Sequence, residues 1–471
     1  MNQQEVLHQI GRAIRARLID PSEIIPISFK DFPGLLVACS GGPDSTCLLS
    51  VLLGLKQDCE LNTKVAHFAY GLRGDESKAE FEFIQSLCKK ENIEFFSRHL
   101  TEEERKLLLK SGLQAKARKL RYDYFQEISE KTRTVITVAH NSQDQVETFF
   151  LNLLRGAGLP GLVGMSEWDS KLFRPLLHVS REEIMQYLER HSVQYCVDSS
   201  NDELKYKRNR IRHQLLPLLD KLEGANKKTI TRTMEHLARE NDYLSEETEK
   251  LLKSLVREEP LHGHSLSAKG VSALHPALQN RILRHLLILF AQDFSLCSSA
   301  LVEELREMIL YGKEGQKSTI RRNVDITLSR GRLYFFPRED KTYKELVPLN
   351  DCTVRAGGFT FQVNKREGSA KSQREHSLYL ALSEIEGDLV IRPHKGEKIS
   401  PAGMEGKKSV SSLLKDKKIP LPFRKMWPIL ADDRGILWIG GLRRSNLVKE
   451  VQHGPYLEIK MTPSVEELVN R

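Results

Sequence analysis

The sequence lacks the features that would direct a chain to a membrane or to an oxidising compartment. No uninterrupted apolar run reaches the ~18 residues of a membrane span, and charged side chains interrupt Met1–Leu18, where a signal peptide would need a hydrophobic region. The 7 cysteines are widely spaced and include no Cys-x-x-Cys pair, so neither a disulfide framework nor a structural zinc site is indicated. These absences predict a cytoplasmic protein with reduced thiols and no membrane partner.

Acidic residues are fewer than basic ones. The chain has 63 Asp and Glu and 72 Lys and Arg, which gives a net charge of +9. This excess is compatible with a polyanionic partner, but many basic proteins never bind nucleic acid, so the total alone decides little. With 40% hydrophobic residues among 471, the composition is that of a globular enzyme and the length allows about three domains.

The first part of the chain alternates short apolar runs with amphipathic stretches. Residues 35–39, 64–68, 93–99 and 134–139 are predicted strands, and stretches such as 77–91 are predicted helices. Strands that alternate with helices favour an α/β domain whose parallel sheet is covered by helices on both faces. In such folds the loops that follow the strands share one edge, where ligands bind.

Three domains are predicted: residues 1–215, 216–344 and 345–471. The first is the α/β domain, and the second is mainly helical but contains a hairpin around Arg330-Gly331. The third mixes strand and helix patterns, as in a small α+β domain.

A glycine-rich loop follows the first predicted strand and precedes a helical segment. Its residues are Ser40, Gly41, Gly42, Pro43, Asp44 and Ser45, and Ala38 precedes it on the strand. Adjacent glycines allow a phosphate to approach the backbone, and the N–H groups at the helix start favour an anion. The lysine of a Walker A loop is absent, so Mg²⁺ or distant arginines must neutralise the charge. Gly-Gly alone also fits an ordinary strand–helix turn.

The whole six-residue string is far more specific. It resembles the PP-loop of the N-type ATP pyrophosphatases, which split ATP between the α- and β-phosphates and adenylate a substrate. The resemblance implies a PP-loop ATPase fold for the first domain and ATP as its cofactor.

An acidic segment follows the fourth predicted strand. A helix over Gln143–Arg155 is predicted, with an apolar stripe made of Val146, Phe149, Phe150, Leu153 and Leu154. Asp144 and Glu147 lie one turn apart on the other side and can jointly hold Mg²⁺ or act on a bound amine. Together with Asp44 they are catalytic candidates, and Asp44 and Asp144 are the candidate Mg²⁺ ligands. A solvated acidic helix start is the alternative for this segment alone.

Two arginines on one predicted helix face, Arg118 and Arg121, are further catalytic candidates, because guanidinium groups bind phosphate oxygens and developing negative charge. An exposed basic helix is an equally good interpretation of that segment alone. His67 and Arg73, at and after the second strand, and His140, after the fourth, are candidate ATP-binding residues, although a lone histidine after a strand is more often structural.

Several longer segments resemble the tRNA(Ile)-lysidine synthetase family. They are 70–77 (YGLRGDES), 117–125 (ARKLRYDYF), 139–162 (AHNSQDQVETFFLNLLRGAGLPGL), 174–177 (RPLL), and 198–201 (DSSN) with Tyr206, Arg208, Asn209 and Arg212 after it. The resemblance is strong over the first ~215 residues and weaker over 391–420. One departure precedes YGLRG, where Ala69-Tyr70 stands in place of the family's Asn-His or Asp-His pair, so no role is carried over to that histidine.

The resemblance implies a ligase that modifies the isoleucine tRNA with a CAU anticodon. ATP would adenylate the 2-carbonyl oxygen of the wobble cytidine with release of pyrophosphate, the ε-amine of free L-lysine would attack that carbon, and AMP would leave. Codon recognition would change from AUG to AUA. On this interpretation Asp44 binds Mg²⁺ or lysine, Asp144 and Glu147 receive the lysine ammonium or the metal, and a nearby carboxylate can take the proton.

Basic clusters are the candidates for tRNA contacts, because Lys and Arg neutralise phosphates without reading sequence. The candidate residues are Arg155, Lys205, Lys207, Arg208, Arg210 and Arg212 in the first domain and Lys407, Lys408, Lys415, Lys417 and Lys418 in the third. Solubility patches are the alternative for each cluster. Phe423 and Trp427 could stack on bases, but packing in the core is the favoured interpretation. The sequence leaves a homodimer open.

Three other functions fit part of the pattern. A tRNA thiolation enzyme can carry the same ATP loop but typically needs reactive cysteines, often as Cys-x-x-Cys. An amide-forming PP-loop ligase for small molecules would not require the basic clusters. A non-catalytic tRNA-binding protein would not require the intact loop or the pair of Asp144 and Glu147.

Overall fold

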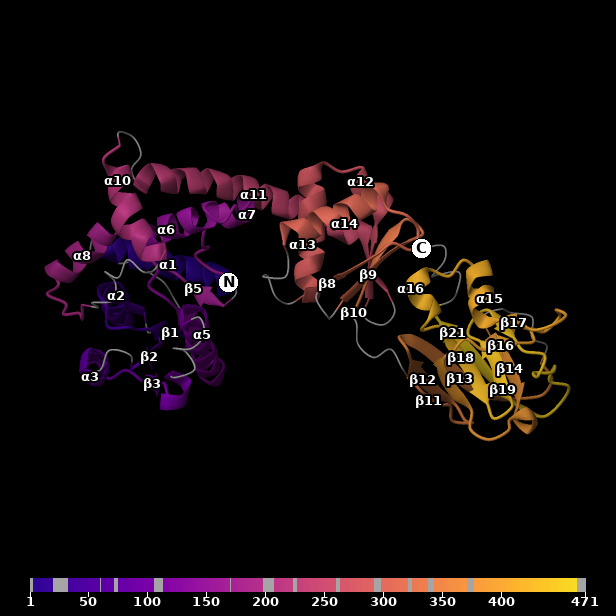
Figure 1. Cartoon of the computed structure of the whole chain (residues 1–471). Coiled ribbons are helices and arrows are strands. Elements are labelled where there is room, and N and C mark those ends of the chain that lie inside the picture. The colour runs from indigo at the N-terminus through magenta and orange to yellow at the C-terminus, as the bar shows by residue number, and fades with distance from the viewer. Residues whose placement is uncertain are drawn as a thin grey trace. The chain divides into compact units, whose positions relative to one another are not determined.

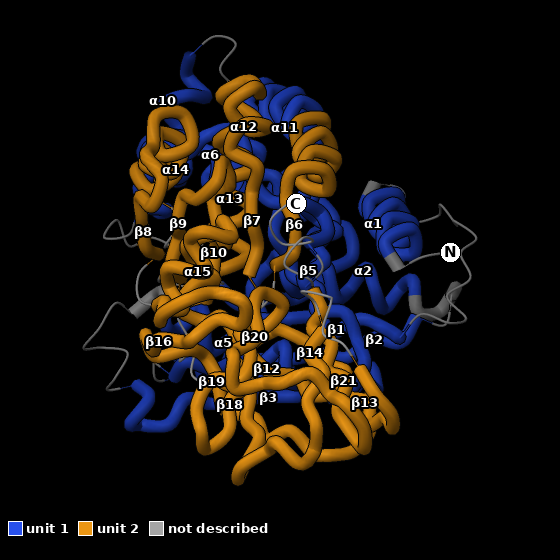
Figure 2. Tube along the Cα trace, turned by 90° about the vertical axis from the view of Figure 1, so that its right-hand side faces the viewer, with its two compact units in different colours: residues 1–242 blue, residues 243–471 orange. Residues whose placement is uncertain are grey.

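The computed structural model describes residues 3–19, 33–59, 61–71, 75–105, 113–169, 171–197, 207–222, 227–259, 263–291, 298–320, 324–337, 343–370 and 377–463. The candidates Arg73 and Lys205 lie outside these residues. Two compact units are present, residues 1–242 and residues 243–471, coloured separately in Figure 2. Among the helices described, none is long and apolar enough to cross a membrane.

A five-stranded parallel sheet forms the centre of the first unit, with the order β3–β2–β1–β4–β5. The strands are β1 (Leu35–Ala38), β2 (Thr63–Ala69), β3 (Phe95–His99), β4 (Val135–Thr137) and β5 (Leu172–Phe173). The four strands predicted from apolar runs and the parallel sheet are confirmed. The fifth strand has two residues, too few to produce a periodic pattern in the sequence.

Helices cover both faces of this sheet, because successive residues of a strand point in opposite directions. Leu35 and Val37 of β1 pack in an apolar cluster with α1, α2 and α8, whereas Leu36 packs in a second cluster with α5. The helices of the unit, most of them labelled in Figure 1, are α1 (Gln3–Ile19), α2 (Pro43–Cys59), α3 (Asp75–Lys90), α5 (Leu113–Thr132), α6 (Ser142–Leu153), α7 (Leu159–Leu162), α8 (Arg181–Arg190), α9 (Lys207–Arg210) and α10 (Leu216–Asp220). A π-helix, Ile211–Leu215, joins α9 to α10.

The order of the strands decides where a ligand can bind. Strand β1 lies between β2 and β4, so the chain leaves β1 toward one side of the sheet and later returns on the other side. In open α/β sheets, the crevice at the carboxyl ends of two such strands is the usual ligand site. The loop 40–45 follows β1 and the segment 140–144 follows β4, and therefore both lie at this point.

The second unit begins with an antiparallel sheet of order β6–β7–β10–β9–β8 that packs against helices. Its elements are β6 (Val256–Glu259), β7 (Gly263–Ser267), α12 (Ala268–Ser272), α13 (Pro276–Ala291), α14 (Ser299–Tyr311), β8 (Lys317–Ile320), β9 (Val324–Ser329) and β10 (Arg332–Pro337), and α11 (Lys227–Leu255) precedes them. The predicted hairpin at Arg330-Gly331 joins β9 to β10. Both turn residues have positive φ, as a two-residue hairpin turn with the correct twist requires.

Three further antiparallel sheets follow in the second unit, with orders β12–β13–β21–β14, β11–β15–β18–β19–β20 and β16–β17. The elements are β11 (Glu345–Leu346), β12 (Cys352–Ala356), β13 (Phe359–Glu367), β14 (Ser377–Ala381), β15 (Val390–Pro393), β16 (Lys398–Ile399), β17 (Lys408–Ser409), α15 (Val410–Asp416), α16 (Leu421–Arg424), β18 (Pro428–Asp432), β19 (Gly435–Ile439), β20 (Arg443–Arg444) and β21 (Pro455–Thr462). One apolar cluster unites Phe361 and Ile459 of the first sheet with Ile429 of the second and Leu414 of α15. This mixture of sheets and helices agrees with the predicted α+β fold.

Candidate active site

Hydrogen bonds among residues 40–46 fix the backbone conformation of the glycine-rich loop. The Ser45 hydroxyl donates to the Gly42 carbonyl (3.1 Å) and accepts from the Ser40 amide (3.2 Å), and the Thr46 hydroxyl donates to the Gly41 carbonyl (3.1 Å). Gly41 has φ +83°, a conformation that side-chain-bearing residues rarely adopt. Helix α2 begins at Pro43, so the amino end of a 17-residue helix points at the loop. Backbone N–H groups there form a site for phosphate.

Asp44, in the first turn of α2, is bound by two groups from distant parts of the chain. The side-chain amide of Asn141 donates to its Oδ1 (3.1 Å), and Arg181, the first residue of α8, forms an ion pair with the same oxygen. Asn141 caps α6, where its backbone N–H donates to Asp144 Oδ2 (3.0 Å). A single asparagine therefore connects Asp44 to Asp144, and the expected convergence of the two carboxylates at one sheet edge is present.

The carboxylates of α6 are bound by two arginines of the α9 segment. Arg208 donates to Glu147 Oε2 and to Asp144 Oδ1, each at 2.5 Å, and Arg212 donates to Glu147 Oε1 at 2.6 Å. The Glu147 side chain is 0% exposed and that of Asp144 is 13% exposed. Burial lowers the pKa of Arg208, but the summed attraction of Asp144 and Glu147 is stronger and raises that pKa above its ordinary value. Arg208 thus remains a cation beside both carboxylates.

Replacing the buried carboxylate of Glu147 is expected to destabilise the first unit. Glu147→Gln removes the negative charge that two guanidinium groups share, and breaking one side of a buried ion pair costs about 3 kcal/mol. Calorimetry of the full chain should show the melting temperature of the first unit falling by roughly 5–10 °C. Glu189→Gln, an exposed site on α8, is the control and should leave it unchanged. An equal melting temperature for both variants would contradict a structural role for Glu147.

His140 lies directly after β4 in a strongly positive environment. Burial, and then the charges of Arg174, Arg208, Arg118 and Arg121, lower the pKa of His140 to about 3. Its Nδ1 atom is buried without a hydrogen-bond partner in the described part of the chain. His140 is therefore a neutral imidazole at physiological pH. Since all four arginines act on one ring, the candidates Arg118 and Arg121 belong to the same neighbourhood as the α6 carboxylates.

This neutral histidine predicts a loss of stability in acid. The pKa of His140 is lowered from 6.5 to about 3 on folding, so between these values the unfolded chain binds the extra proton, and stability falls as the pH drops below 6.5. The contribution approaches about 1.4 kcal/mol per pH unit. Between pH 7 and pH 5.5, His140→Asn should lose about 1 kcal/mol less stability than the parent chain in urea denaturation. Equal losses would show that His140 takes up its proton in the folded state.

The other ATP-binding candidates lie around the loop. His67, on β2, is 3% exposed, and its Nδ1 is 2.9 Å from the carbonyl oxygen of Cys39, beside the loop. Burial lowers the pKa of His67, so this ring is also neutral. On α5, the guanidinium groups of Arg118 and Arg121 lie 4.8 Å and 5.3 Å from the ring centre of Tyr122, within the range of a cation–π interaction.

The basic candidates differ in exposure. Arg155, Lys207, Arg210, Lys407, Lys415 and Lys418 are exposed, whereas Arg208, Arg212, Lys408 and Lys417 are half-buried. Phe423 and Trp427 are 1% and 0% exposed and belong to the core of the second unit. Packing in the core, the favoured interpretation of both aromatic residues, is therefore confirmed.

Sequence reasoning missed the partners of the carboxylates. Arg181 was not a candidate, although its place directly after the helix-capping Ser180 marks the start of a helix. Arg208 and Arg212 were predicted to bind tRNA, but here they bind Asp144 and Glu147. Arg208 and Arg212 are four residues apart in one helical segment, and Asp144 and Glu147 are three residues apart in another helix. Each pair therefore lies on one side of its helix. This matching spacing is the signal that could have suggested the pairing.

The parallel sheet, the loop after β1 and the acidic helix after β4 define an ATP-binding domain of the PP-loop class. A family model described as a PP-loop domain matches residues 13–219, and models described as the TilS substrate binding domain and the TilS substrate C-terminal domain match residues 266–334 and 389–459.

Curated relatives match most of this chain over most of their own length. Proteins named tRNA(Ile)-lysidine synthase are 30% identical in Clostridioides difficile (88% of this chain, 92% of that one) and in Nitrosomonas europaea (91% and 93%), and 28% identical in Caldanaerobacter subterraneus subsp. tengcongensis (88% and 90%). The chain belongs to the tRNA(Ile)-lysidine synthase family, and the resemblance seen in its motifs is confirmed.

Proposed function

We propose that this chain ligates free L-lysine to carbon 2 of the wobble cytidine of the CAU-anticodon isoleucine tRNA. ATP first adenylates the cytidine with release of pyrophosphate, and the amine of lysine then displaces AMP. The observation that carries the proposal is the junction of the loop carboxylate Asp44 and the α6 carboxylate Asp144 through Asn141. A reaction with these two steps needs a phosphate site and an amine site side by side, and this junction supports such an arrangement. Access to tRNA places the enzyme in the cytoplasm.

ATP is proposed to bind at the loop, with backbone N–H groups of 40–45 donating to its phosphate oxygens. Ala38 ends β1, which leads into the loop, and His67 lies on the neighbouring β2, with its Nδ1 2.9 Å from the carbonyl oxygen of Cys39. Arg118 and Arg121 are proposed to stabilise the negative charge that develops on the phosphates, as planar guanidinium donors do. The neutral His140 can accept or donate one hydrogen bond without adding charge.

We propose that Mg²⁺ binds at Asp44. Its carboxylate offers an oxygen ligand of the type that Mg²⁺ takes, usually one or two carboxylates together with substrate phosphates. In the structure its charge is balanced by Arg181. When bound, the metal supplies charge neutralisation for the α-phosphate and the departing pyrophosphate.

We propose Asp144, rather than Glu147, as the contact for the lysine ammonium. Glu147 is covered completely by Arg208 and Arg212, whereas Asp144 keeps an exposed edge. We propose that Glu147 keeps the two guanidinium groups in place and that Asp144 faces the incoming amine. A carboxylate so placed can also accept a proton as the amine attacks.

The tRNA is proposed to contact both units. Exposed lysines in the second unit (Lys407, Lys415 and Lys418) supply contacts to phosphates without reading bases, and the first unit receives the anticodon loop. Contacts of this kind should weaken steeply as salt rises.

Incubation with labelled lysine tests the proposal. The full chain is mixed with ATP, Mg²⁺, labelled lysine and isoleucine tRNA that carries either a CAU or a GAU anticodon. Label should enter the CAU tRNA and require ATP. Label in neither tRNA would reject the ligase, and label in both would reject the specificity. Sedimentation of the same sample would show whether the active species is a homodimer.

A further inference from the structure

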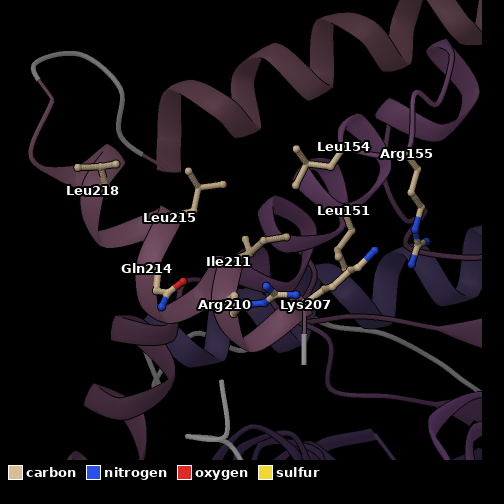
Figure 3. A pocket seen from close by; sticks show the side chains of 9 residues that line it. All are labelled: Leu151, Leu154, Arg155, Lys207, Arg210, Ile211, Gln214, Leu215 and Leu218. Atoms are coloured by element: carbon tan, nitrogen blue, oxygen red, sulfur yellow. The ribbon is translucent and has the colours of Figure 1, made fainter. Parts of the chain in front are cut away.

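An apolar pocket with a basic rim lies on the first unit, beside the carboxylate site but separate from it. Its volume is about 480 Å³, and the residues that line it are Leu151, Leu154, Arg155, Lys207, Arg210, Ile211, Gln214, Leu215 and Leu218. Figure 3 shows side chains from the end of α6 and from the α9–α10 segment around one space. The lining contains three cations and no acid, and the volume is in the range of small-molecule sites.

The three rim cations are available for a ligand. In the described part of the chain, the side chains of Arg155, Lys207 and Arg210 have neither a hydrogen-bond nor an ion-pair partner, and all three are exposed. By contrast, Arg208 and Arg212 on the same segment are bound to Asp144 and Glu147. The segment therefore presents two faces, one bound to the catalytic carboxylates and one directed to the pocket.

The helical phase explains these two faces. Residues 208 and 212 are four apart and share one side, whereas 207, 210, 211 and 214 recur at helical spacing on the other. The π-helix Ile211–Leu215 adds one residue to its turn, and π-helical turns occur frequently at functional sites. Ile211, Leu215 and Leu218, at positions i, i+4 and i+7, all line the pocket.

Two of the apolar side chains that line the pocket are strongly exposed, whereas Ile211 is buried. Leu154 is 74% exposed and Leu218 is 56% exposed, although the sequence pattern places Leu154 on the buried stripe of its helix. Exposed apolar side chains gathered in a groove and surrounded by polar groups mark a site where a partner binds.

The pocket lies next to the reacting groups. Helix α6 carries Glu147 at one point and Leu151 a single turn further, about 6 Å along the axis. We propose that the pocket holds an unstacked base of the anticodon loop, a neighbour of the cytidine that is modified, while Arg155, Lys207 and Arg210 contact the phosphates on either side. This inference rests on the proposed function and adds to it a subsite for the nucleotide beside the target.

Charge and chemistry favour single-stranded RNA as the occupant. Recognition of RNA loops commonly combines a surface that buries the face of an unstacked base with cations that contact the backbone. In a symmetric dimer, the pocket of a second copy would have to place acidic groups opposite the three cations. The pocket lining contains no acidic residue, so a symmetric contact would bring like charges together. An RNA loop supplies both an apolar base and anionic phosphates.

The experiment uses the full chain with Leu154→Glu and the matched control Leu222→Glu, since Leu222 is 55% exposed and lies outside the pocket lining. The probe is the CAU anticodon stem-loop with 2-aminopurine placed at one loop position at a time. We expect one position beside the wobble cytidine to change its fluorescence on binding. Leu154→Glu should abolish that change and weaken binding about tenfold, raising the KM for tRNA but not for ATP, whereas Leu222→Glu should do neither.

The basic rim of the pocket is tested separately, by the salt dependence of RNA binding. Arg155→Ala should reduce the salt dependence of stem-loop binding by about one ion, and Lys131→Ala, an exposed cation on α5, should not. Unchanged affinity and fluorescence in Leu154→Glu, with a parent chain that still makes lysidine, would overturn the subsite alone. A parent chain that makes no lysidine would overturn the proposed function instead. If Leu154→Glu dissociates a dimer without changing RNA affinity, the pocket is an interface between copies and the subsite is wrong.

Discussion

Asp144→Asn should stop lysine transfer while adenylation of the tRNA continues. The asparagine keeps an oxygen that can accept from the backbone N–H of Asn141, and Glu147 still holds Arg208 and Arg212, so α6 and its neighbours keep their places. What disappears is the accessible negative charge that we propose faces the lysine ammonium. Loss of one partner of a charged hydrogen-bonded pair costs about 2–5 kcal/mol, so we expect lysidine formation to fall at least about 30-fold, with a raised KM for lysine.

The two half-reactions separate this role from metal binding. Release of labelled pyrophosphate from ATP in the presence of tRNA reports adenylation, and labelled lysine reports the second step. Asp123→Asn, an exposed acidic position on α5, is the control and should leave both unchanged. If Asp144→Asn abolishes pyrophosphate release as well and high Mg²⁺ restores it, Asp144 is a metal ligand rather than the lysine contact. Undiminished lysidine formation would reject any role for Asp144.

Asp44→Asn should stop both half-reactions. Asp44 lies in the first turn of α2, the helix proposed to receive the phosphates, and is the carboxylate of the loop itself. Without its charge, the loop loses the oxygen ligand proposed for Mg²⁺, and Arg181 loses its ion-pair partner. Removal of one preorganised electrostatic contact to a reacting group lowers rates by about 10²–10³, so pyrophosphate release and lysine incorporation should fall together by that factor.

A split between the two measurements would contradict this assignment. Should Asp44→Asn release pyrophosphate at the parent rate and fail only to incorporate lysine, Asp44 would be the lysine contact instead. Binding of ATP to the variant, measured by calorimetry with and without Mg²⁺, shows whether the metal accounts for the loss. An affinity that no longer depends on Mg²⁺ supports the proposed role.

Much of the first unit could be predicted from local patterns. The four longer strands appear as apolar runs of a few residues, and the loop 40–45 lies between one such run and a helix. The start of α6 is local as well, because Asn141 and Asp144 form a capping box three residues apart. Such features depend on neighbours within one turn or one strand, so the sequence displays them directly.

Side-chain pairings between distant segments could not be predicted in this way. Asp44 and Asn141 are 97 residues apart, and Arg208 reaches carboxylates more than 60 residues earlier. The apolar stripe predicted on α6 was correct for Val146, which is buried, but wrong for Leu153 and Leu154, which are exposed. The charged Glu147 is buried instead. Burial of a carboxylate becomes favourable only when two guanidinium groups arrive to pair with it.

The sequence by itself determined the class of fold, the phosphate-binding loop and the family, since each of these is encoded in contiguous residues. Only the tertiary structure decided which cations neutralise the carboxylates and which remain exposed. Helical spacing assigns 208 and 212 to one side and 207 and 210 to the other, but it does not say which side meets α6. That choice depends on how α6 and the α9–α10 segment pack, and packing is a property of the whole unit.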